Sequence, residues 1–162
     1  MCEPSRFIAI YRAVIEQGLG VTAHVAEDER AVMFTFDEIV YVLRNTAPQS
    51  PGLLDIAVYL SNDEDPGIKA EACRQVARSV PCLVAWVDSD GDIVLNVQSL
   101  TGPMRLMPSI GTIKEVLPEA MEMLRYAFVK VCESAVLAGI VSASDEDGAS
   151  AKHRRTPTDR AA

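Results

Sequence analysis

The sequence predicts an α+β domain, in which a largely antiparallel sheet of about five strands carries helices packed on it. Apolar, β-branched and aromatic residues gather in five short runs typical of strands, and apolar residues recur at helical spacing in three longer stretches. Neighbouring runs of the first kind are joined by short connections, which favours antiparallel pairing. The predicted order of elements is α-β-β-β-α-β-β-α.

The first half of the chain is predicted to form one helix and then three strands. An amphipathic pattern near the N-terminus stops at Gly18 and Gly20, which are typical helix ends. The runs ERAVMFTF and IVYVLRN, separated by Asp37 and Glu38, predict a hairpin. LLDIAVYL predicts the third strand, and VTAHV at 21–25 could add a short one.

The second half begins with a helix that Asp65 can cap, since Pro66 suits a first helical turn. Pro81 ends this helix. Two strands, CLVAWVD and DIVLNVQ, follow on either side of the stretch DSDGD.

The last predicted helix starts near Thr112, which has the spacing of a capping box with Glu115. Pro118 lies inside the helical pattern, so we expect a kink there or a new helix that begins at this proline. Periodicity ends at Ser142. We therefore predict a single α+β domain over residues 1–141 and a disordered tail over 142–162, whose composition buries too little apolar area to fold.

Composition narrows the classes of partner. The chain has 15 basic and 23 acidic side chains, a formal net charge of -8, which disfavours nucleic acid and anionic membrane surfaces. Cys2, Cys73, Cys82 and Cys132 form no CxxC pair and lie among apolar neighbours, as expected of buried thiols in a reducing compartment. With no signal-peptide pattern and no membrane-spanning run, the expected location is cytoplasmic.

The stretch DSDGD at 88–92 has the composition of a calcium loop, but its positions do not fit one. Counted from Asp88, glycine falls at position 4 instead of 6, and position 12 is Ser99 instead of glutamate. The flanking runs are also strand-like. The stretch therefore predicts a tight turn, with Asp90 and Gly91 at positions that tolerate positive φ.

Catalytic and cofactor signatures are not found in the sequence. His24 is the one histidine outside the predicted tail, and no nucleophile motif surrounds it. The acidic run from Asp63 to Asp65 is assigned to the start of the second helix, whose dipole it complements. We predict no catalytic residue, no metal ligand and no cofactor.

The strand at 82–88 is apolar on both sides, which predicts that both of its faces are buried. Helices can cover one face. The other needs a further helix, the apolar loop LTGPMRLMPSIG or a second subunit. We take Trp86, Met104, Leu106 and Met107 as candidate partner-binding residues, because methionine adapts readily to a contact surface; a lid over the core is the alternative for the loop.

GLGV after the first helix, the pair AVMFTF and IVYVLRN, and DGDIVLNV before a long final helix together resemble the YbjN-type proteins, which share the fold of the type III secretion chaperones. The resemblance spans about residues 5–138 and rests on the order of elements. It implies a small, acidic, often dimeric cytoplasmic protein that binds segments of client proteins, and it supplies no catalytic residues.

Our leading hypothesis is a non-enzymatic, chaperone-like or regulatory domain that forms a homodimer and binds a protein partner, a client or a regulatory protein, through an apolar face. The alternative is a small-molecule sensor or enzyme with a pocket near Trp86 and His24. A structural subunit of a larger assembly is a third hypothesis.

Overall fold

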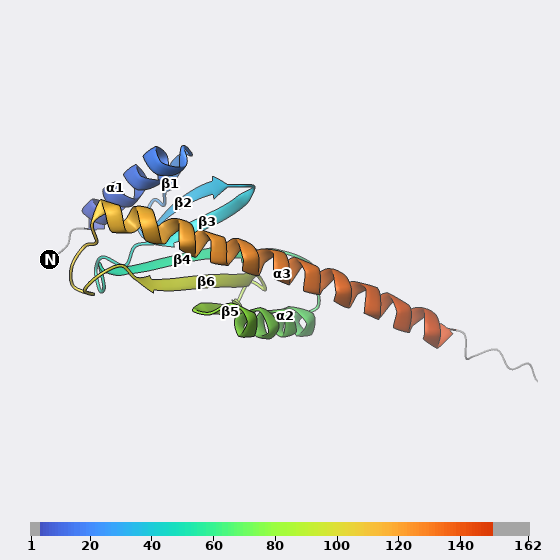
Figure 1. Ribbon diagram of the computed structural model, residues 1–162. Coiled ribbons are helices and arrows are strands. Elements are labelled where there is room, and N and C mark those ends of the chain that lie inside the picture. The colour runs from blue at the N-terminus through green and yellow to red at the C-terminus, as the bar shows by residue number, and fades with distance from the viewer. Residues whose placement is uncertain (1–3, 151–162) are drawn as a thin grey trace, which may run out of the picture.

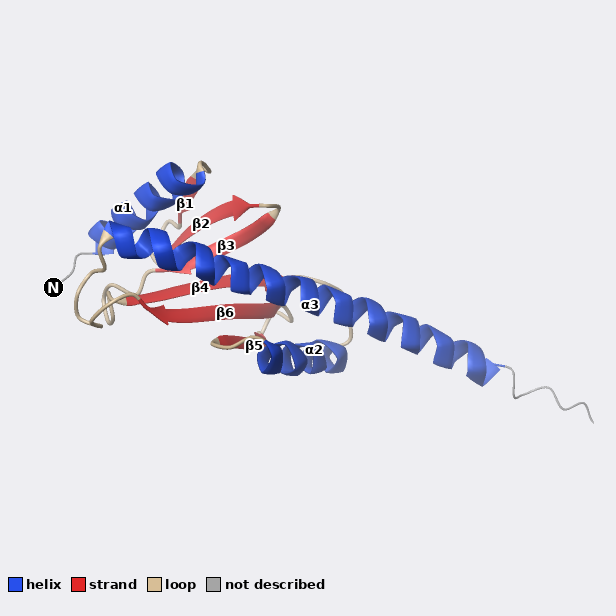
Figure 2. Cartoon of the chain, viewed as in Figure 1, coloured by secondary structure: helices blue, strands red, loops and turns tan. Residues whose placement is uncertain are grey.

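The structure, a computed structural model, describes residues 4–150 and the side chains of residues 6–134. One sheet and three main helices make up the fold (Figures 1 and 2). The elements are α1 (Pro4–Val14), the π-helical turn η1 (Ile15–Leu19), β1 (Ala23–Val25), β2 (Ala31–Phe36), β3 (Ile39–Arg44), β4 (Leu53–Leu60), α2 (Pro66–Ser79), β5 (Leu83–Val87), β6 (Ile93–Leu100) and α3 (Ile110–Ser150).

The sheet has six strands in the order β1-β2-β3-β4-β6-β5, and every neighbouring pair is antiparallel. The α+β class and the largely antiparallel sheet are therefore confirmed. The sixth strand is β1, which the sequence offered as a short additional strand. β1 and β5 form the two edges of the sheet.

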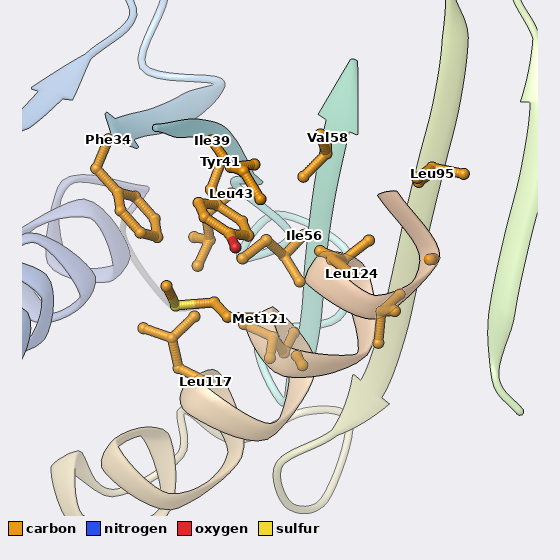
Figure 3. Close-up of a cluster of buried hydrophobic side chains, with 14 of the residues drawn as sticks. Phe34, Ile39, Tyr41, Leu43, Ile56, Val58, Leu95, Leu117, Met121 and Leu124 are labelled. Carbon is orange, nitrogen blue, oxygen red and sulfur yellow. The ribbon is translucent and has the colours of Figure 1, made fainter. Parts of the chain in front are cut away.

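The helices pack against one face of the sheet and enclose the hydrophobic core. Every second residue along the strands points into this core, as alternation requires. Figure 3 shows Leu117, Met121 and Leu124 of α3 facing the side chains of four strands. The strand side chains labelled in that view are Phe34, Ile39, Tyr41, Leu43, Ile56, Val58 and Leu95.

The start of α2 agrees with the sequence, whereas the start of α3 does not. Asp65 Oδ1 accepts a hydrogen bond of 2.7 Å from the amide of Gly67 at the start of α2. In α3 the capping side chain is Ser109, whose Oγ accepts from the amide of Thr112 at 3.1 Å. The predicted cap at Thr112 is wrong because Ser109 offers a hydroxyl to the first free amides one turn earlier.

α3 runs without interruption through Pro118, so the predicted new start at this proline is wrong. Proline removes one amide donor and its ring crowds the carbonyl of Lys114, but the packing of Leu117, Ala120 and Met121 holds the surrounding turns on the sheet. The helix continues to Ser150, nine residues into the predicted tail, and 151–162 lie outside the described residues. The boundary at 141 stays a prediction.

DSDGD is a turn that joins β5 to β6. The amide of Asp88 donates to the carbonyl of Asp92, and the carbonyl of Asp88 accepts from the amide of Gly91. Asp88 Oδ1 accepts from the amides of Asp90 and Asp92. Gly91 has a φ of 85°, but Asp90 does not adopt positive φ, so that part of the prediction is wrong. One residue with positive φ, Gly91, is enough to reverse the chain here, because the loop is a type I turn followed by a bulge.

The cysteines only partly follow the prediction of buried thiols. Cys73 is buried, and burial raises the pKa of its thiol. Cys82 and Cys132 are exposed free thiols, which corrects the prediction for both, and Cys2 lies outside the described residues. Cys82 is exposed because it precedes β5 with a φ of 62°, and Cys132 because it lies off the core-facing side of α3.

Candidate partner-binding surface

The face of the sheet that points away from the helices is not covered by any helix of the described residues 4–150. Strand register places the side chains of five strands on it together. We call this the open sheet face and define it by its apolar members Met33, Val40, Tyr59, Val84, Trp86 and Leu100. All but Trp86 are exposed, including Val40 at 52% and Leu100 at 63%.

Polar side chains fill the centre of the open sheet face. Asp55 is almost fully buried there. Its carboxylate is satisfied by hydrogen bonds, since Asn96 Nδ2 donates to Oδ1 at 2.7 Å and Gln98 Nε2 donates to Oδ2 at 2.9 Å. Arg44 Nη1 lies 3.6 Å from Asp55 Oδ1, and Arg44 Nη2 donates to the Tyr59 hydroxyl at 2.9 Å. A buried carboxylate satisfied in this way orders the surrounding side chains, so the surface is largely preformed.

Trp86 is half-buried beside this polar group. The guanidinium carbon of Arg44 lies 6.0 Å from the centre of the Trp86 ring, at the outer limit of a cation–π contact. Trp86 therefore belongs neither to the core nor to a closed pocket. It forms part of the open sheet face, in the same cross-strand row as Val40 and Tyr59, with Val94 between Tyr59 and Trp86.

The prediction that both faces of the strand at 82–88 are buried is wrong. β5 is an edge strand, and α2 covers only its inner face, where Leu83 is buried. On the outer face Val84 is 55% exposed. β5 is apolar on both faces, as the sequence indicates, but no helix of the described residues covers its outer face.

The four predicted partner-binding residues do not form one site. Trp86 is opposite Val94, near the start of β6, whereas the loop follows Leu100 at its end, six residues or about 20 Å further along. In the loop Met104 and Leu106 are exposed, and Met107 is half-buried against the core. The loop thus both covers the core, through Met107, and exposes apolar side chains.

His24 and Trp86 lie on opposite edges of the sheet, in β1 and β5. Five strand spacings separate these edges, about 24 Å. The alternative hypothesis of a pocket built near Trp86 and His24 is therefore wrong. The order of the strands depends on long-range packing, which local sequence patterns do not show. The exposed His24 lies opposite Met33 of β2.

Several hollows lie on the helix side. One of about 550 Å³ lies between the end of α2 and α3, with Val80, Pro81, Met123 and Tyr126 as its apolar lining. Another, of about 270 Å³, is lined partly by Tyr41, whose pKa burial raises, and by Arg125. Neither lining includes a histidine or a cysteine.

The described residues contain no group of three or more histidine, cysteine or acidic side chains arranged to hold a metal ion. Within the same part of the chain, no helix combines the length and the apolar character that crossing a membrane requires.

The open sheet face was partly detectable from the sequence. Val40 and Val42 alternate with Ile39 and Tyr41, so β3 is apolar on both sides just as β5 is. Met33, Tyr59 and Leu100 carry no such signal, because single apolar residues on an outer face are common.

No protein-family model matches the chain, and no curated protein matches it. A chain in the structure of the HopA1–SchA chaperone–effector complex is similar to it, with 15% sequence identity and a TM-score of 0.47. The match covers 77% of this chain and 96% of the other. The resemblance to YbjN-type proteins stays a prediction.

Proposed function

We propose that the chain is a non-enzymatic, chaperone-like domain that binds an apolar segment of a client protein on the open sheet face. The observation that carries this proposal is one apolar cross-strand row, in which Val94 joins Tyr59 and Val40 to Trp86, and which no described helix covers. Exposed apolar patches of this kind are typical of protein-binding sites.

The client is proposed to be extended. The side chains of a sheet face repeat in rows about 7 Å apart along the strands. An extended segment repeats its own side chains at the same interval, so alternate apolar residues can contact successive rows. The rigid polar centre around Asp55 limits the ordering cost on the side of this protein.

We also propose that the chain forms a homodimer through β5. Its five residues, LVAWV, include no lysine, proline or acidic residue that would discourage pairing of an edge strand. Ala85 is at the centre, so an antiparallel pair would place Val84 opposite Trp86 of the second copy. The two open sheet faces would then join across the dimer. A cytoplasmic location is proposed on the free, exposed thiols of Cys82 and Cys132.

The client-binding proposal is tested by suppression of aggregation of a thermally unfolded reporter protein. We call the row of Val40, Tyr59 and Trp86 the contact row. Val40→Asp is expected to abolish suppression of aggregation, because it places an uncompensated charge in this row. Val129→Asp is the matched control, since Val129 on α3 is similarly exposed at 46% but lies away from the sheet face. Equal activity of both variants would contradict the proposal.

A further inference from the structure

The two ends of the sheet differ sharply in charge. Three connections meet at one end: the β2–β3 turn, the β4–α2 loop and the β5–β6 turn. β2, β4 and β5 alternate with β3 and β6 in the sheet and all end there, at Phe36, Leu60 and Val87. We call this the acidic end and define it by eight carboxylates. They are Asp37, Glu38, Asp63, Glu64, Asp65, Asp88, Asp90 and Asp92.

The opposite end carries little net charge. Its connections, residues 26–30, 45–52 and 101–109, contain three acidic side chains and two basic ones, Arg30 and Arg105. Asp28 there is paired with Arg30 at 3.2 Å. Apolar Leu100, which belongs to the open sheet face, also lies at this end.

None of the eight carboxylates at the acidic end forms an ion pair with another described residue. Arg125, which lines one hollow together with Asp37, is paired with Glu122 at 3.2 Å. Another nearby cation, Lys69, is buried, and its ammonium donates to the carbonyls of Asn62 at 2.6 Å and Gly91 at 2.7 Å. Lys69 thus fastens the β4–α2 loop to the β5–β6 turn and holds their carboxylates close together. The negative potential of this end remains available to a partner.

The contact row of the open sheet face borders the acidic end. Val40 lies two residues after Glu38, Tyr59 one residue before the end of β4, and Trp86 two residues before Asp88. A segment whose apolar side chains contact this row therefore places its next residues, one or two positions on, over the carboxylates.

From this we infer that the client segment is apolar and extended with lysine or arginine at one end, and that the acidic end binds this basic flank and so sets the direction in which the segment lies. The inference rests on the proposed function, because it names the class of segment bound at the same surface. The same charges repel segments with acidic flanks, which adds selectivity.

The probes are two synthetic peptides, each long enough to span the sheet along its strands. Both alternate valine with serine, and one ends in lysines and the other in glutamates. Binding is measured by fluorescence anisotropy at low and high salt. The full-length protein is expected to bind the lysine peptide about tenfold more tightly, with the difference shrinking as salt screens it.

The test variant removes one charge from each acidic connection: Glu38→Gln, Asp63→Asn and Asp90→Asn, all exposed. The matched control is Glu27→Gln, Asp28→Asn and Glu29→Gln, which removes three charges at the opposite end. The test variant is expected to lose most of the preference for lysine, and the control to keep it. Circular dichroism confirms that both remain folded.

Each other outcome overturns a distinct statement. If both peptides bind equally and Val40→Asp abolishes both, the proposed function stands and the basic flank is wrong. If the control variant loses the preference for the lysine peptide as fully as the test variant, the net charge of the protein causes this preference and the acidic end has no special role. If neither peptide binds, the proposed function fails and this inference fails with it.

Discussion

Tyr11 is the described residue at which burial and hydrogen bonding conflict most clearly. Its side chain is fully buried, and its ring packs on Phe7 with centroids 4.3 Å apart. Among the described residues its hydroxyl has no hydrogen-bond partner, and the hydroxyl of nearby Thr101 donates to the carbonyl of Gly52 instead. Burial raises the pKa of Tyr11 well above its ordinary range, and the side chain of Thr101 offsets this only in part.

Replacement of this hydroxyl is our first prediction at the residue scale. Tyr11→Phe is expected to raise the free energy of unfolding by up to about 1 kcal/mol, because it removes an unsatisfied buried polar group while keeping the ring. Urea unfolding at neutral pH measures this. A loss of 1 kcal/mol or more would show that the hydroxyl has a partner.

The pH dependence follows from the same residue. A tyrosine whose folded pKa is raised contributes stability below its unfolded pKa of about 10, and this is lost as pH rises beyond that value. Between about pH 9 and pH 11 the wild type should therefore lose more stability than Tyr11→Phe. Tyr41, whose pKa is also raised by burial, remains in both proteins, so some loss persists in the variant.

At the scale of elements, β5 combines two properties that are rarely found together. It is an edge strand, and it consists entirely of apolar residues. The other edge, β1, has only three residues and exposes His24, which makes it a poor template for pairing. Any strand addition to this sheet is therefore expected at β5.

Val84→Lys is expected to convert the proposed homodimer into a monomer, because a lysine on an edge strand discourages pairing and would replace the apolar contact between Val84 and Trp86 of the second copy. Light scattering coupled to size-exclusion chromatography measures the mass. Val129→Lys, at a similarly exposed valine on α3, should leave the dimer intact. A wild-type protein that is monomeric at micromolar concentration would refute dimerisation through β5.

At the scale of the whole molecule, the helices lie on one side of the sheet and α3 extends beyond it. Ser134 still lies beside the first turns of α2, including Gly67 and Ile68. Figure 1 shows the ribbon of α3 continuing clear of the sheet and of α2 after this region. Sixteen more helical residues to Ser150 correspond to about 24 Å.

A chain that ends at Val141 is therefore expected to keep the stability of the full chain within about 0.5 kcal/mol. A chain that ends at Tyr126 is the contrasting variant, since it loses buried Ala127 and Val131 and should be destabilised by several kcal/mol. Chemical denaturation of all three proteins measures this. Marked destabilisation of the longer truncation would refute the domain boundary at 141.

The sequence by itself determined the elements, most of their ends and the α+β class, because alternation, helical spacing, Asp65 and the DSDGD turn act over a few neighbouring residues. It also indicated that β5 and β3 are apolar on both sides. Only the tertiary structure decided where the strands lie in the sheet. That order makes β5 an edge and separates Trp86 from His24, and the antiparallel pairing gathers acidic connections distant in sequence at one end. Such placements depend on long-range packing, which no local pattern of residues encodes.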